Sequence, residues 1–384
     1  MSVRVAWLLC VGVVACAPAT TPEVTPPAAP TCAVPETIEA PLEIPFGLYS
    51  VPVDRFEELS AAGVTMVGPY YGGAIDPALL DAAHDHGLRV LYPVGFEEAR
   101  ADDEARALLE AQVDAVVEHP AVGGWYVLPE EMRPWVDAEV EYLAWARSVV
   151  RGRDALGRPL LSYQPNHRRR KELVATSASL DVVTRGLYAN FVGATHSRAW
   201  VREGASTIAD AATDEQTPWA VLEMFAQPDT ADLDRVGAWV RHDVYASLVG
   251  GARGVLVFSG WPREGFDAYG TYLDAYLEVA AELNGAQSLA TPLLRGVPSS
   301  DVEVRLVEGP QTVAVGGRDV RSVAWTVVRD GETTWAYVVN SAEVAVGVHI
   351  QTRCPAEVVL GPRLDSDVLR LPALGVSVLR APSL

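Results

Sequence analysis

The feature that most constrains the fold is a repeated alternation between residue 44 and about residue 285. Short, continuous apolar runs are each followed by a polar segment or one with helical spacing. Continuous apolar runs suit parallel strands buried on both faces, with helices as the crossovers between them. Eight such runs occur, and they read PFGLYSV, TMVGPYY, RVLYPVG, GGWYVL, PLLSYQPN, LDVVTRGLYAN, WAVLEMF and GVLVFSGW. Eight successive βα units predict a closed (β/α)8 barrel, the TIM barrel, over residues 44–285.

Local signals predict where two of the helices begin. Asp54 has Glu57 three residues on, which is the spacing of a capping box. Asp76 is followed by Pro77, which is typical of an N-cap with proline at the first helical position. These signals predict helices that open at residues 54 and 76.

The pattern of apolar and polar residues changes after residue 285. Segments such as VEVRLV and SVAWTVV alternate apolar and polar residues, and no helical segment separates them. Asp330-Gly331 stands between two such segments and is a strong hairpin signal. Residues 286–384 are therefore expected to form a small all-β sandwich, so the predicted fold class is an α/β barrel followed by a β-sandwich.

The first residues have the pattern of an export signal. Arg4 precedes the apolar run Val5–Ala15, which is too short to span a bilayer but has the length of a signal-peptide core. The run ends in VVAC at Cys16, which resembles the lipobox of bacterial lipoproteins. That resemblance implies a signal peptide over 1–15, a lipidated Cys16, and an exported protein anchored to the envelope. The outer membrane is the expected destination, because Ala17 stands where a retention signal has Asp. An ordinary secretory signal is the alternative.

Residues 16–43 are rich in Pro, Thr and Ala and are expected to form an extended tether. The chain has 4 cysteines. Cys10 would leave with the signal peptide and Cys16 would carry lipid, which leaves Cys32 and Cys354. An exported pair can form a disulfide, which would join the tether to the last domain. The sequence leaves this pairing open.

Composition and charge exclude several partners. The formal net charge of -20 disfavours nucleic acid and anionic membrane surfaces, so only the lipid anchor would contact a membrane. No phosphate-binding or dinucleotide motif is present, and no cofactor is expected. His84 and His86 resemble a metal pair, but they precede Gly87 at an expected helix end, so no metal site is predicted. Oligomeric state stays open.

Aromatic residues stand at the expected ends of the strands. Catalytic groups of (β/α)8 barrels lie at the carboxyl ends of the strands. Aromatic rings there would stack on the C–H faces of sugars, while their polar edges bind hydroxyl groups. A carbohydrate substrate is therefore expected, with packing beneath loops as the alternative for each ring. The residues are Tyr49, Tyr70, Tyr71, Tyr92, Trp125, Tyr126, Tyr163, Tyr188, Phe225 and Trp261.

Two of the runs are followed or closed by a glutamate, Glu130 and Glu223. This pair, with Trp125 five residues before Glu130, resembles the clan A glycoside hydrolases, the 4/7 superfamily of (β/α)8 barrels. The resemblance implies that Glu130 is the acid/base and Glu223 the nucleophile of a retaining glycoside hydrolase. It also implies that Tyr188 lies beside the nucleophile and that Trp261 stacks under a sugar. A retaining mechanism requires the two carboxyl groups to lie about 5–5.5 Å apart.

The sequence departs from the pattern of that family at several positions. Pro129 stands where the family has an Asn that holds the sugar's 2-hydroxyl, and Gly186 stands where related barrels often have Asp. The second apolar run lacks the usual arginine. A glycan-binding surface lipoprotein without turnover therefore remains an alternative, as does a purely structural envelope protein.

Further substrate contacts are expected around the same face, from Tyr49, Tyr71, Trp125 and Tyr163. Asn166, or Gln164 beside it, could replace the missing amide. The basic run from His167 to Lys171 follows the fifth strand. A solvated helix start is the simpler interpretation, and contact with an anionic glycan is the alternative.

Overall fold

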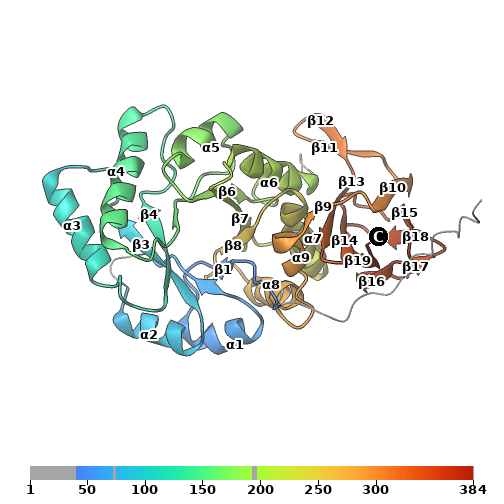
Figure 1. Cartoon of the computed structure of the whole chain (residues 1–384), viewed down its shortest axis with the longest axis horizontal. Coiled ribbons are helices and arrows are strands. Elements are labelled where there is room, and N and C mark those ends of the chain that lie inside the picture. The colour runs from blue at the N-terminus through green and yellow to red at the C-terminus, as the bar shows by residue number, and fades with distance from the viewer. Residues whose placement is uncertain (1–39, 72–74, 193–196, 384) are drawn as a thin grey trace, which may run out of the picture. The chain divides into compact units, whose positions relative to one another are not determined.

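The computed structural model describes residues 40–71, 75–192 and 197–383 (Figure 1). The expected signal peptide, the lipidated Cys16, most of the tether and Cys32 lie outside these residues. Within them, no helix combines the length and the hydrophobicity needed to cross a membrane.

Eight parallel strands form one sheet in the order β5-β4-β3-β2-β1-β8-β7-β6. The strands at the two ends of this order, β5 and β6, are joined by backbone bonds from Asp181 to Leu160 and from Gly186 to Gln164, each 2.9 Å long. The sheet is therefore a nearly closed barrel, and the predicted fold class is confirmed. The strands are β1 (Phe46–Leu48), β2 (Met66–Val67), β3 (Arg89–Gly95), β4 (Val122–Leu128), β5 (Leu160–Leu161), β6 (Val182–Leu187), β7 (Thr217–Glu223) and β8 (Gly254–Phe258).

Helices alternate with these strands and surround them (Figure 1). Asp76 caps the second helix, accepting a bond from the backbone N–H of Ala78 as expected. The expected cap at Asp54 is wrong, because Asp54 lies in a 3-10 turn and the first helix begins only at Phe56. The helices are α1 (Phe56–Ala61), α2 (Pro77–Asp85), α3 (Asp103–Asp114), α4 (Asp137–Arg153), α5 (Arg170–Ser177), α6 (Ala199–Ala211), α7 (Val236–Val249), α8 (Tyr269–Asn284) and α9 (Thr291–Arg295).

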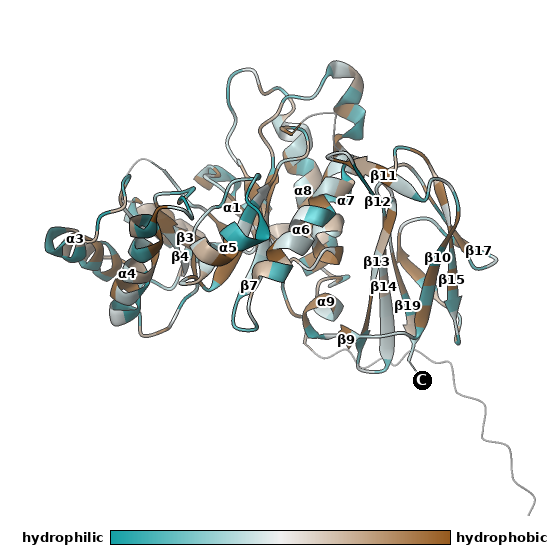
Figure 2. Cartoon of the chain, turned by 90° about the horizontal axis from the view of Figure 1, so that it is seen from above, coloured by the Kyte–Doolittle hydropathy of each residue, from teal (hydrophilic) through white to brown (hydrophobic). Residues whose placement is uncertain are grey.

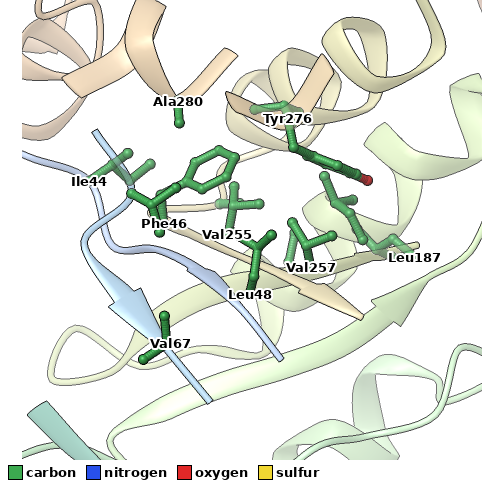
Figure 3. Packing of buried hydrophobic residues seen from close by; sticks show 14 of the residues in the cluster. Ile44, Phe46, Leu48, Val67, Leu187, Val255, Val257, Tyr276 and Ala280 are labelled. Carbon is green, nitrogen blue, oxygen red and sulfur yellow. The ribbon is translucent and has the colours of Figure 1, made fainter. Parts of the chain in front are cut away.

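The strands bury side chains on both faces. Successive residues of a strand point to opposite faces, so one set fills the barrel and the other packs against the helices. Figure 3 shows the outer set where Phe46 and Val255, on β1 and β8, lie close to Tyr276 and Ala280 of α8. Tyr126 and Leu161 belong to the inner set. This alternation decides which strand-end residues can reach the barrel mouth.

The C-terminal strands form two antiparallel sheets and a separate hairpin, β11–β12. Hydrophobic residues, brown in Figure 2, give these strands a core of their own. The predicted hairpin at Asp330-Gly331 joins β13 to β14, and Gly331 has a φ of 58°, which glycine adopts without strain. The strands are β9 (Val297–Pro298), β10 (Val302–Glu308), β11 (Thr312–Val315), β12 (Arg318–Arg321), β13 (Val323–Asp330), β14 (Thr333–Asn340), β15 (Val346–Thr352), β16 (Glu357–Leu360), β17 (Leu364–Asp365), β18 (Val368–Leu371) and β19 (Val376–Pro382).

Cys354 lies between β15 and β16, where it is buried and disulfide-bonded. Cys32, its expected partner, lies outside the described residues. The pairing of these two cysteines stays a prediction.

Candidate active site

Glu130 lies two residues beyond the end of β4 and is held by tyrosines. Tyr126, an inward residue of β4, and Tyr71, which follows β2, both donate their hydroxyl groups to Oε1 of Glu130, the latter at 2.6 Å. The hydroxyl of Tyr49, which follows β1, lies 3.1 Å from that of Tyr126. Residues from three strands of the barrel thus fix this carboxylate.

Burial raises the pKa of Glu130 above its usual value. The hydroxyl groups of Tyr126 and Tyr71 oppose this shift because they favour the ionised carboxylate, and the negative charge of Glu131 adds to it. Glu130 is partly exposed, and its partner Tyr71 is 45% exposed. A carboxyl group with a raised pKa beside solvent is suited to general acid catalysis.

Glu223 is the last residue of β7 and is only 3% exposed. The backbone N–H of Asn190 lies 3.1 Å from each of its carboxylate oxygens, and that of Phe191 lies 3.2 Å from Oε2. Burial raises the pKa of Glu223 to about 7, although the positive charge of Arg198 and these N–H groups oppose the shift. The loop after β6 therefore supplies the main hydrogen bonds to this carboxylate.

Tyr188 has a different neighbourhood from the expected one. Its ring stacks on Tyr163 with 6.2 Å between centroids and 13° between planes, and it meets Phe225 edge-on at 5.1 Å. Tyr188 was expected beside the nucleophile, but the hydrogen bonds to the Glu223 carboxylate come from the backbone N–H groups of Asn190 and Phe191. Tyr163 and Tyr188 instead form an aromatic pair inside the barrel.

An aromatic cluster connects the surroundings of the two glutamates. Phe258, which pairs with Glu223 in the sheet, lies 5.4 Å from Tyr49 and 5.7 Å from Phe225 between ring centroids. Trp261 meets Phe258 edge-on at 5.6 Å. Trp261 is partly exposed at the end of β8, where the sequence placed it. Sequence reasoning missed Phe258, because its run ends on Trp261 and nothing distinguishes Phe258 from a core residue.

Trp125 is fully buried and does not lie at the mouth. Its indole N–H donates to Asp154 at 2.8 Å, and Arg158 lies 5.9 Å from its ring. Because Tyr126 points into the barrel, its neighbour Trp125 points outward to the helices. The expected contact between Trp125 and a sugar is therefore wrong, and its role is packing.

The region after β5 contains one unexplained polar group. The side-chain amide of Gln164 is buried, and neither its oxygen nor its nitrogen has a hydrogen-bond partner among the described residues. Asn166 is partly exposed, and its backbone oxygen accepts a bond from Nε of Arg185 at 2.9 Å. Asn166 is therefore accessible to a ligand, whereas Gln164 lies deeper.

The basic run after β5 starts α5 and braces the loop that carries Glu130. Arg168 is buried and donates from Nη2 to the backbone oxygens of Glu131 and Met132, at 3.2 and 3.0 Å. Arg170 donates to the backbone oxygen of Asp210. These contacts favour the structural interpretation of the run. In the described part of the chain, no group of three or more His, Cys, Asp and Glu is placed to hold a metal ion.

Comparisons with known proteins give a match at the level of structure. No protein-family model matches the sequence, and no curated protein does. Amy13B of Eubacterium rectale superposes with a TM-score of 0.59 at 8% identity, over 90% of this chain and 97% of that one. The α-amylase of Geobacillus thermoleovorans in complex with acarbose gives 0.55 at 10%, over 86% and 91%. AmyP in complex with maltose gives 0.55 at 11%, over 86% and 90%.

At these identities the likeness defines the fold alone. The chain has a (β/α)8 barrel followed by an all-β domain, a fold that these structures share, and the predicted fold class is confirmed. A fold of this kind hosts many activities, and the residues of the site decide which one a chain has.

Proposed function

We propose that this protein is a retaining glycoside hydrolase in which Glu130 is the acid/base and Glu223 the nucleophile. The observation that carries the proposal is the setting of Glu130 at the barrel mouth. Among the described residues, both tyrosine hydroxyls bind Oε1, so Oε2 is the oxygen that can hold a proton for a leaving group. The raised pKa of Glu130 favours that proton.

The chemistry assigns one step to each carboxyl group. Glu130 protonates the glycosidic oxygen while the carboxylate of Glu223 attacks the anomeric carbon, which breaks the C–O bond and forms a glycosyl ester. Glu130 then removes a proton from water, which attacks the same carbon and releases Glu223. The backbone N–H groups of Asn190 and Phe191 favour the ionised form of Glu223 that this attack needs.

The surrounding rings support a carbohydrate as the substrate. Tyr71 and Phe191 are exposed, and Trp261 is partly exposed beside the aromatic cluster. Such rings bind the C–H faces of sugars. Two of the structurally similar proteins are in complex with acarbose and maltose, which supports the same substrate class. A poly- or oligosaccharide outside the cytoplasm fits the expected export signal.

A screen of polysaccharides and aryl glycosides tests the proposal. The parent protein should release reducing sugar from at least one substrate, and Glu130→Gln and Glu223→Gln should each abolish this release. Retention should appear by NMR as a first product with the anomeric configuration of the substrate. Inverted product, or activity that survives in Glu223→Gln, would refute the assignment.

A glycan-binding protein without turnover is the second candidate, and the burial of Glu223 favours it. A nucleophile has to reach the anomeric carbon, whereas Glu223 is 3% exposed and bonded to backbone groups. In that case glycans would bind to the parent without cleavage, and Tyr71→Ala or Trp261→Ala would weaken the binding. Calorimetry on the parent and the two variants separates the two candidates.

We also propose export and lipid anchoring through Cys16. The disulfide at Cys354 supports this location, because disulfides persist mainly in oxidising compartments. The protein should incorporate a fatty-acid analogue and fractionate with the outer membrane, and Cys16→Ser should abolish both. An unlabelled, unanchored parent protein would contradict the proposal.

A further inference from the structure

A chain of buried polar side chains leads from Glu223 toward the β-sandwich. The backbone N–H of Asn190 binds Glu223, and Oδ1 of Asn190 accepts a bond from Nη1 of Arg198 at 2.7 Å. Arg198 also donates to both carboxylate oxygens of Asp243 on α7, at 3.0 and 2.5 Å. This two-point contact fixes the plane of the guanidinium group.

The chain ends at a side chain of the β-sandwich. Nδ1 of His242 lies 2.8 Å from Asp243, and Nε2 of His242 lies 2.9 Å from Oγ of Ser341, the residue after β14. An ionised carboxylate only accepts hydrogen bonds, so Nδ1 carries a proton. The order Ser-His-Asp resembles a hydrolase triad. Ser341, His242 and Asp243 are only 2%, 0% and 4% exposed, so no substrate reaches the serine.

Charged and polar groups from three elements interact with Glu223. Arg198 stands before α6, Asp243 lies on α7, and Tyr272 and Tyr276 lie on α8. The hydroxyl of Tyr276 donates to the backbone oxygen of Glu223 at 2.9 Å. Arg198 is the cation among these groups whose charge acts on Glu223, and Asp243 has the opposite effect.

Arg198 and Asp243 are both charged in spite of their burial. Burial acts to lower the pKa of Arg198, but the negative charges of Asp243 and Glu223 outweigh it, and the pKa is raised. Burial acts to raise the pKa of Asp243, but Arg198 and His242 outweigh it, and the pKa is lowered. A fixed cation therefore faces Glu223.

We propose that Arg198 is the positioning residue that sets the charge of Glu223, and that the β-sandwich holds it in place through Ser341. The inference rests on the proposed function, because an attacking carboxylate must be ionised. A nearby cation favours the ionised carboxylate, whereas a buried glutamate without one takes up a proton. The β-sandwich then contributes to the barrel site by holding Arg198 near Glu223.

A titration of Glu223 tests the inference without a substrate. Glutamate labelled with ¹³C at Cδ reports ionisation by NMR, and Glu223→Gln identifies the signal. In Arg198→Gln the pKa of Glu223 should rise by about 1 to 3 units, because the opposing charge is lost. Arg198→Lys keeps the charge and should restore most of the parent titration. Ser341→Ala should shift it in the same direction by a smaller amount.

The matched control is Ser377→Ala, the same substitution at another buried serine of the sandwich, whose Oγ donates to Leu360 at 2.8 Å. It should leave the titration of Glu223 unchanged. An unchanged titration in Arg198→Gln overturns the inference. If circular dichroism shows that Arg198→Gln is unfolded, Ser341→Ala replaces it, and an unchanged titration of Glu223 in Ser341→Ala then overturns the inference.

Turnover, measured separately, keeps the two proposals distinct. If Arg198→Gln shifts the titration of Glu223 while the parent protein cleaves no glycoside, the role of Arg198 is supported and the proposed function is contradicted. If Arg198→Gln leaves the titration unchanged while the parent protein is active, only the role of Arg198 is overturned.

Discussion

The variant Glu223→Gln measures how the burial of this carboxylate changes the free energy of unfolding with pH. Burial raises the pKa of Glu223 from its ordinary value of 4.5 to about 7. The folded protein therefore holds the proton more tightly than the unfolded chain does. The stability that this provides is present in full below the unfolded pKa and is lost as the pH rises through 7. Glutamine resembles the protonated side chain at every pH, so the variant escapes this loss.

The expected size follows from the linkage relation. Between pH 5 and pH 8 the parent should lose about 2.5 kcal/mol of unfolding free energy relative to Glu223→Gln. Urea unfolding followed by tryptophan fluorescence at both pH values measures the difference. Glu215→Gln, at an exposed glutamate just before β7, is the matched control and should show no such trend. A difference in unfolding free energy between the parent and Glu223→Gln that is the same at pH 5 and pH 8 would refute the reasoning. It would mean that burial does not shift the pKa of Glu223.

Three further outcomes follow from the site. Tyr71→Phe removes a hydroxyl that favours ionised Glu130, so the alkaline limb of kcat/KM should move up by about one pH unit; an unmoved limb would contradict the contact. Glu130→Ala should slow glycosides with poor leaving groups by about 100-fold or more, and activated aryl glycosides far less, in steady-state assays. Equal losses would remove Glu130 as the acid. Trp125→Phe deletes the bond to Asp154 and should lower the unfolding free energy by about 1–3 kcal/mol with KM unchanged; a raised KM would return Trp125 to the substrate site.

The pattern of apolar runs was sufficient to predict the barrel and the hairpin at Asp330-Gly331. It could not predict which way each side chain of a run points. A strand buried on both faces, such as GGWYVL, shows no alternation, so the sequence assigned both Trp125 and Tyr126 to the mouth. The structure sends Trp125 outward and leaves Tyr126 facing Glu130.

The buried polar chain beside Glu223 had no signal in the sequence. Arg198 and Asp243 stand 45 residues apart, and His242 and Ser341 stand 99 apart. Each is an ordinary surface residue by type, and only the packing of α7 against both domains brings them together. Asp54 failed as a cap because it lies inside a 3-10 turn, which delays the helix to Phe56.

The barrel is a rolled sheet whose two edge strands, β5 and β6, meet along one junction. Neighbouring strands elsewhere share ladders of backbone bonds, whereas here two such bonds, from Asp181 and Gly186, join the edges. The stacked rings of Tyr163 and Tyr188 lie across the same line, one from each side. Side-chain packing therefore supplements the backbone bonds along this line, and the aromatic pair helps to close the barrel where β5 and β6 share no strand ladder.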